Sequence, residues 1–305
     1  MALLAVGLGA CGGSGRESSS AQQVLSPTPA QPFTPTLAPT LAELPQTSVE
    51  VIAFQWGEEA LQWGELYLPA SAQEPWPTLV MIHGGCWQAS YTLSLQAALS
   101  KALAERGYAV WNIEYRSLGS GGKWPVMFQD VAAATDYLAE LSEFYPLNMD
   151  AIVAMGHSAG GHLALWLAGR EKIAADSALY FEDFVSIKGT ITLGGIADLQ
   201  SGACAGAASA IIESAVLSEA DLKTRLTNTS PINMLPVGKP TVLISGQRDG
   251  IVPPELSQAY YLAALAEGDS SEHIVLEGAG HFELINPQAF DLTIIDEAIE
   301  RISGQ

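Results

Sequence analysis

The sequence predicts an α/β fold: a mostly parallel central sheet with helices on both faces. Short apolar runs rich in β-branched residues alternate along the chain with longer segments of helical periodicity. Strands that alternate with helices form parallel sheets whose two faces are covered by the connecting helices. The chain has 305 residues, 48% of them hydrophobic, which is enough for one substantial core. It contains no internal repeat and no apolar stretch long enough to span a membrane.

Each element is assigned from its hydrophobic pattern. Residues 48–54 and 59–68 alternate between apolar and polar side chains, which predicts an opening antiparallel pair. The later strands are continuous apolar runs and are predicted at 78–82, 109–113, 152–155, 187–193, 240–246 and 273–276. Helical spacing predicts helices at about 93–105, 124–141, 162–167, 253–267 and 288–302. Between the sixth and seventh strands, residues 198–229 are rich in Ala, Gly and Ser and are predicted to be irregular.

The sequence GHSAG at residues 156–160 lies where a predicted strand turns into a predicted helix. A sharp turn at this place strains the backbone at Ser158, and the flanking glycines let neighbouring chain pass without a Cβ clash. The serine hydroxyl then projects above the sheet, at a helix N-terminus whose free N–H groups favour negative charge. This context predicts that Ser158 is a catalytic nucleophile.

A nucleophilic serine needs a base and an acid that orients the base, and after such an elbow they follow in the order acid, histidine. Asp249 follows the strand at 240–246, and His281 lies on the Gly-rich loop after the next strand. Either residue alone is as well explained by an ordinary turn or surface loop. The ordered set predicts a triad of Ser158, Asp249 and His281. Asp198 also follows a strand and is a second candidate for the acid, ranked lower because Asp249 lies in a tight turn just before the histidine strand.

The strand at 78–82 runs directly into His83, Gly84 and Gly85. Glycines here allow backbone N–H groups to turn toward the carbonyl oxygen of a bound acyl group. We expect an oxyanion hole made by the N–H groups of Gly85, Cys86 and Ala159. The other three histidines, His157, His162 and His273, lack the loop position that a triad base needs.

Together these motifs make residues 48–303 similar to the α/β-hydrolase superfamily. The sequences HGGCW at 83–87, EYR at 114–116, GHSAGGHLA at 156–164, SPIN at 230–233 and GHF at 280–282 resemble the esterase/kynurenine-formamidase-like branch. That branch includes carbohydrate-acetyl and feruloyl esterases. The resemblance implies a cap over the site, formed here by residues 198–229. Cys86 departs from the small or aromatic residue that is commoner at its position, but the hole uses only its backbone.

The predicted function is a serine hydrolase that cleaves small acyl or carbohydrate-linked carboxylic esters through an acyl-enzyme, without metal or organic cofactor. An arylformamidase with the same triad is the nearest alternative. An acyl-peptide or dipeptidyl peptidase is a further one, although such enzymes usually carry a large accessory domain. A non-catalytic binding module on the same scaffold is disfavoured by the complete triad.

The net charge limits the classes of possible binding partner, and the cysteine count limits the possible disulfides. Thirteen Lys and Arg against 33 Asp and Glu give a net charge of −20, which argues against nucleic-acid partners. The expected partner is a small-molecule or oligosaccharide ester. The three cysteines are too few and too scattered to form a disulfide framework.

The first 47 residues predict an export signal and a tether. Residues 1–10 form an apolar run, and LGAC at 8–11 resembles a bacterial lipobox, in which Cys11 is lipidated. No Lys or Arg precedes the run, which is explained if the true start lies upstream of Met1. Residues 12–47 are rich in Ser, Pro and Thr and predict a disordered tether to a catalytic domain at 48–305. We expect a lipid-anchored protein of the cell envelope, with a secreted or periplasmic protein as the alternative.

Overall fold

The computed structural model describes residues 48–70 and 72–304 of the chain. The predicted signal, the lipobox cysteine Cys11 and the predicted tether lie outside the described residues. All structural statements below concern the described part.

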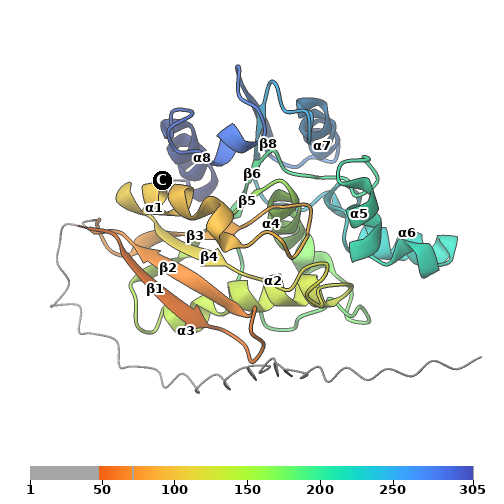
Figure 1. The fold of residues 1–305 in the computed structure, drawn as a ribbon, viewed down its shortest axis with the longest axis horizontal. Helices are drawn as coiled ribbons and strands as arrows, with labels where there is room; N and C mark the ends of the chain where they lie inside the picture. The colour runs from red at the N-terminus through yellow and green to blue at the C-terminus, as the bar shows by residue number, and fades with distance from the viewer. Residues whose placement is uncertain (1–47, 71, 305) are drawn as a thin grey trace, which may run out of the picture. The chain divides into compact units, whose positions relative to one another are not determined.

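Eight strands form one sheet in the order β1-β2-β4-β3-β5-β6-β7-β8 (Figure 1). The first two pairings in this order are antiparallel: β1 (Glu50–Gln55) with β2 (Trp63–Leu68), and β2 with β4 (Ala109–Ile113). All later pairings are parallel. The remaining strands are β3 (Trp76–Ile82), β5 (Leu147–His157), β6 (Gly189–Leu193), β7 (Thr241–Gly246) and β8 (Ser271–Leu276). The sheet is therefore mostly parallel, as predicted.

Alternate side chains of β3 divide the core into two layers. Leu79 packs in one cluster with Leu99 of α1 (Ala97–Glu105), and Ile295 of α8 (Thr293–Ser303) belongs to the same cluster. Its neighbour Val80 belongs to the opposite cluster, which contains Phe128 and Trp166. Because successive strand side chains point to opposite faces, helices cover the sheet on both sides.

The second layer is built by α2 (Val126–Asp136), α4 (Ala159–Gly169) and α7 (Pro254–Ala266). Phe128 lies on α2 and Trp166 on α4, with their rings 5.1 Å apart. Tyr260 of α7 packs in a third cluster with Leu165 of α4 and Leu243 of β7. Short 3₁₀ helices are Leu93–Gln96, Arg170–Lys172, Ser214–Val216, Pro231–Met234 and Phe282–Ile285.

The predicted helix at 124–141 is interrupted in the structure. It divides into α2 and the short α3 (Leu138–Leu141). The carbonyl of Ala134, which would accept the N–H of Leu138 in a continuous helix, accepts the indole N–H of Trp111 at 2.7 Å. A tertiary contact from β4 thus coincides with the break, and the local pattern could not reveal it.

Residues 198–229, called the cap below, contain two helices rather than the irregular chain that was predicted. They are α5 (Ala205–Ile211) and α6 (Glu219–Thr227). The cysteine count predicted no disulfide framework and gave no sign of a single bond, yet Cys86 and Cys204 are bonded to each other across 118 residues of sequence. The distance along the chain hid this pair, since nothing local links the two positions.

Candidate active site

Ser158 lies at the sharp turn between β5 and α4. Its backbone angles are φ 55° and ψ −120°, a conformation that L-residues rarely adopt. The two glycines of the motif make this turn possible. A Cβ at Gly156 would lie 2.2 Å from the carbonyl oxygen of Gly160, and one at Gly160 would lie 2.0 Å from that of Ile82. Only glycine fits at either position, so the helix approaches β3 closely and its N-terminus begins at the serine.

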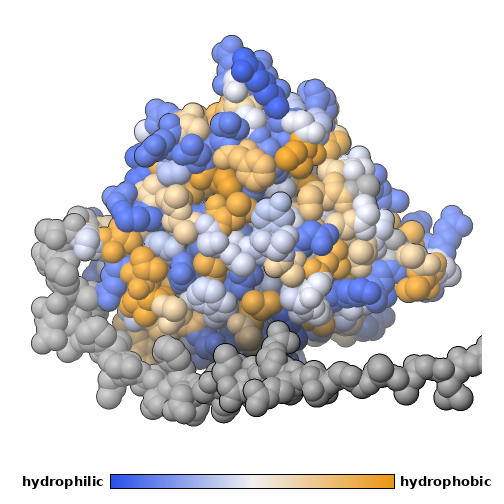
Figure 2. Space-filling view, viewed as in Figure 1, coloured by the Kyte–Doolittle hydropathy of each residue, from blue (hydrophilic) through white to orange (hydrophobic). Residues whose placement is uncertain are grey.

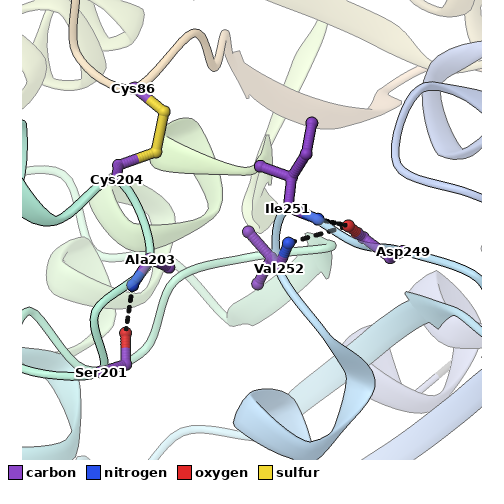
Figure 3. Close-up of a disulfide and its surroundings, with 7 residues drawn as sticks. All are labelled: Cys86, Ser201, Ala203, Cys204, Asp249, Ile251 and Val252. Carbon is purple, nitrogen blue, oxygen red and sulfur yellow. Dashed lines mark hydrogen bonds between the residues drawn. A yellow bond between two sulfur atoms is a disulfide. The ribbon is translucent and has the colours of Figure 1, made fainter.

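Asp249 and His281 form a buried pair behind the serine. Asp249 follows β7, His281 follows β8, and Nδ1 of the histidine lies 2.6 Å from Oδ2 of the carboxylate. The other oxygen of Asp249 accepts the N–H groups of Ile251 and Val252 at 2.9 and 2.8 Å (Figure 3). Burial by itself raises the pKa of Asp249, but these hydrogen bonds outweigh it and the pKa lies below its usual value. The carboxylate is therefore ionised and accepts from Nδ1–H, which leaves the lone pair of the neutral ring on Nε2.

The backbone brings the serine next to this pair. The N–H of Ser158 donates to the carbonyl of Leu193 at 2.9 Å. The next residue, Gly194, borders the pair, because a Cβ there would lie 3.1 Å from Oδ2 of Asp249 and 3.3 Å from Nδ1 of His281. The hydrogen bond between Oγ of Ser158 and Nε2 of His281 is not formed in this structure. In enzymes without substrate this bond is commonly long and tightens on binding.

The loop of residues 83–87, called the oxyanion loop below, passes directly beside the serine. A Cβ at Gly84 would lie 3.0 Å from Cβ of Ser158 and 2.6 Å from the carbonyl oxygen of His157. Among the described residues, nothing accepts a hydrogen bond from the N–H groups of Gly85, Cys86 or Ala159. These three donors are therefore available to an oxyanion formed at Ser158.

A buried carboxylate holds the oxyanion loop from below. Oε1 of Glu114 lies 2.9 Å from Nε2 of His83 and accepts the N–H of Tyr115 at 3.0 Å. Its Oε2 accepts the N–H of Leu93 at 3.0 Å. The hydroxyl of Tyr115 donates to the carbonyl of His83 at 2.7 Å, and the two rings stack at 4.4 Å. The EYR motif that supported the family resemblance thus anchors the loop that starts the HGG motif.

His157 is a residue of the site that the sequence did not indicate. Its Nε2 lies 3.1 Å from the carbonyl oxygen of His281, and the two rings are 4.4 Å apart. Burial, with a smaller contribution from His281, lowers the pKa of His157 to about 3. The ring is therefore neutral and donates from Nε2, tying the backbone of the histidine loop to the elbow. The position was set aside as the variable residue of the motif, and only the tertiary contact shows its use.

The remaining candidates lie apart from this pair. Asp198 accepts the N–H of Gln200 at 2.8 Å and lies 3.4 Å from the hydroxyl of Ser230, so it stabilises a turn rather than a histidine. His162 is buried in α4, where its Nε2 donates to the carbonyl of Thr229 at 2.8 Å. His273 lies within β8, with Nε2 at 3.1 Å from the hydroxyl of Ser245.

The sheet topology, the strained serine between β5 and α4 and the carboxylate–histidine pair after β7 and β8 define the class: the catalytic domain has the α/β-hydrolase fold. The model of the BD-FAE family matches residues 65–263, more than half of the chain. The chain belongs to this family.

Relatives of known sequence include two esterases. A rice (Oryza sativa subsp. japonica) protein named "Probable isoprenylcysteine alpha-carbonyl methylesterase" is 31% identical over 109 residues, which are 36% of this chain and 26% of the relative. Esterase LipC of Mycobacterium tuberculosis is 27% identical over 250 residues, which are 76% of this chain and 60% of LipC. The chain thus spans only about a quarter of the rice protein that it matches.

Two solved structures share the fold. A truncated carbohydrate esterase from gut microbiota has a TM-score of 0.70 at 20% identity, over 83% of this chain and 97% of that one. Esterase B from Lactobacillus rhamnosis has a TM-score of 0.71 at 20% identity, over 85% and 88% of the two chains. In the described part of this protein, no cluster of three or more His, Cys, Asp or Glu side chains is arranged to hold a metal ion. No helix among the same residues is both long and apolar enough to cross a bilayer.

Proposed function

We propose that this protein is a serine carboxylesterase with Ser158 as nucleophile, His281 as general base and Asp249 as the acid that orients the base. The observation that carries the proposal is the 2.6 Å contact between the ionised Asp249 and Nδ1 of His281, placed next to a serine in a strained elbow. Because Asp249 keeps the proton of the imidazole on Nδ1, the lone pair of Nε2 is free to accept a proton from the serine.

The proposed reaction has two halves. Oγ of Ser158 attacks the ester carbonyl while Nε2 of His281 takes its proton, and the N–H groups of Gly85, Cys86 and Ala159 stabilise the oxyanion. The imidazolium, stabilised by Asp249, then protonates the leaving alcohol. In the second half His281 activates a water molecule, which hydrolyses the acyl-enzyme and regenerates Ser158.

We propose small acyl or carbohydrate-linked esters as the substrates. Support comes from the shared fold of a carbohydrate esterase and of esterase B, whose phosphonate complex is named for tributyrin. Exposed apolar side chains near the site add to it. Tyr91, 41% exposed, packs against Gly85 of the oxyanion loop, and Phe282, 51% exposed, lies edge-on to His281. On the face seen in Figure 2, hydrophobic residues occur in small groups between hydrophilic ones.

The proposed location is the cell envelope, with Cys11 as the lipid attachment site. The disulfide between Cys86 and Cys204 supports a compartment outside the cytoplasm, because disulfides persist in oxidising environments. The same consideration disfavours the arylformamidase alternative, which serves intracellular metabolism.

The test is Ser158→Ala, assayed with p-nitrophenyl acetate and with a fluorophosphonate probe that labels activated serines. Removing a triad serine typically lowers turnover by about six orders of magnitude, so we expect neither hydrolysis nor labelling. The circular dichroism spectrum should be unchanged, because the substitution removes only a hydroxyl. Residual activity above a few per cent, in a preparation free of wild type, contradicts the assignment. A wild-type protein that hydrolyses N-formylkynurenine much faster than any ester supports the formamidase alternative instead.

A further inference from the structure

A disulfide joins the oxyanion loop to the cap. Cys86 is one of the proposed oxyanion donors, and Cys204 stands at the start of α5, with their Cα atoms 5.6 Å apart (Figure 3). Neither cysteine is fully buried. The bond is therefore within reach of a small reductant in solution.

The oxyanion loop needs support on both sides because its backbone is strained. Gly85, Cys86 and Trp87 have φ values of 105°, 50° and 55°, so two residues with side chains stand in the left-handed region. Such conformations persist only where the surroundings enforce them. One side is held by Leu118, which donates to the carbonyl of Trp87 at 2.8 Å and accepts the N–H of Ala89 at 2.9 Å. The other side faces the cap, to which Cys86 is bonded.

The cap around Cys204 consists of small residues, of which Ala203 and Ala208 are buried in the core while the glycines border open space. Positions 201–208 read SGACAGAA, and a Cβ at Gly202 or Gly206 would meet no atom within 4 Å. The far end of the cap is well anchored: the N–H of Trp124 donates to Ile211 at 2.9 Å, and His162 binds Thr229. Small side chains make few contacts each, and the covalent bond adds a fixed link between this segment and the oxyanion loop.

We infer that the disulfide between Cys86 and Cys204 is a positioning element of the oxyanion hole, a role that rests on the proposed esterase function. By tying the Cα of Cys86 to the start of α5, it fixes the direction of the N–H groups of Gly85 and Cys86. These donors contact the oxygen most strongly when it becomes an oxyanion, so loosening them weakens transition-state binding more than substrate binding.

Reduction gives a direct test on the folded enzyme. Dithiothreitol supplies two electrons and two protons; the Sγ–Sγ bond breaks, each sulfur becomes a thiol, and the reagent closes to its cyclic disulfide. The full chain carrying Cys11→Ser keeps Cys86 and Cys204 as its only cysteines, which removes effects of the third thiol. Because losing one oxyanion donor costs about 10²–10³ in turnover, we expect loosening to lower kcat for p-nitrophenyl acetate at least about tenfold. KM should stay within about twofold, and reoxidation should restore kcat.

Two further measurements separate positioning from stability. Cys11→Ser/Cys204→Ser should show the same low kcat with and without reductant. A trifluoromethyl ketone, which forms an oxyanion adduct with the serine, should bind more weakly in proportion to the loss of kcat/KM. Circular dichroism at the assay temperature verifies that each form is folded. If the double variant fails to fold, the reduced and oxidised forms of Cys11→Ser carry the comparison.

A reduced protein with a lower melting temperature but unchanged kcat and inhibitor affinity overturns the inference and makes the bond purely structural. A parallel rise in KM without loss of kcat overturns it too. These outcomes differ from failure of the proposed function, in which the oxidised wild type neither hydrolyses esters nor reacts with a fluorophosphonate.

Discussion

Replacing Asp249 by Asn keeps the shape of the side chain and changes only its charge and hydrogen-bond character. In the protein, Oδ1 accepts two backbone N–H groups and Oδ2 accepts Nδ1–H of His281. An asparagine that keeps its oxygen toward Ile251 and Val252 must direct its NH₂ group at His281. The neutral ring then carries its proton on Nε2, where it cannot take one from Ser158, and the imidazolium loses its counter-charge.

The expected loss is large for turnover and small for stability. The same exchange in a serine protease lowers kcat by about 10⁴-fold, which is about 5.5 kcal/mol of transition-state stabilisation. Losing one charge-assisted hydrogen bond while both backbone donors stay paired should cost only about 1.5–3 kcal/mol of folding free energy. Initial rates with p-nitrophenyl acetate and denaturant unfolding measure the two quantities separately.

Asp198→Asn is the matched control. Asp198 also follows a strand but accepts a backbone N–H at 2.8 Å through Oδ1, a role that an amide oxygen can keep. Its turnover should stay within about twofold of wild type because no catalytic group contacts it. If Asp198→Asn is the more damaging of two equally stable variants, the assignment of the acid is wrong.

Three further outcomes are expected. Burial lowers the pKa of His157 to about 3 and of His162 to about 4, whereas both titrate near 6.5 when unfolded. The unfolded chain therefore binds more protons between about pH 6.5 and 4, and close to two more near pH 5. The free energy of unfolding should therefore fall with falling pH, most steeply near pH 5 by at most about 2.7 kcal/mol per unit, and by about half of that in His162→Gln; equal slopes in denaturant titrations contradict this. Glu114→Gln turns one buried acceptor into a donor facing an N–H group, so guanidinium unfolding should show a loss of about 1–3 kcal/mol with lower kcat, and unchanged stability would argue against the anchoring role. Expressed with a complete signal sequence, the protein should enter the membrane fraction, and Cys11→Ser should be released or stay unprocessed with its apolar leader attached; a mature N-terminus upstream of Cys11 in mass spectra refutes lipidation.

The sequence was sufficient for the features that depend on local pattern. The continuous apolar runs at β3, β4 and β7 were predicted as strands, and their side chains are covered on both faces of the sheet, as in parallel sheets generally. The pairing of Asp249 with His281 could also be predicted from the sequence, since both follow parallel strands and the carboxyl ends of such strands meet at one edge.

Features that depend on contacts between distant residues could not be predicted from the sequence. The helix break at Tyr137 coincides with the hydrogen bond from the Trp111 indole of another strand to the carbonyl of Ala134. The cap helix α5 was missed because its Ala, Gly and Ser residues give no amphipathic pattern, and α6 was missed because it is short and mostly polar. The pairing of Cys86 with Cys204 and the bond from His157 to the carbonyl of His281 join residues more than 100 positions apart. In the helix break and in these two long-range contacts, the partner residue, and not the residue itself, carries the information.

The same disulfide changes what a protease can do to this protein. Residues 174–186, between α4 and β6, are mostly exposed and lie inside the stretch that the bond closes. A cut there yields one polypeptide with Ser158 and another with His281, still linked by Cys86 and Cys204. Separating the pieces then requires reduction as well as unfolding. Clipped molecules run as one band on a non-reducing gel and as two after reduction.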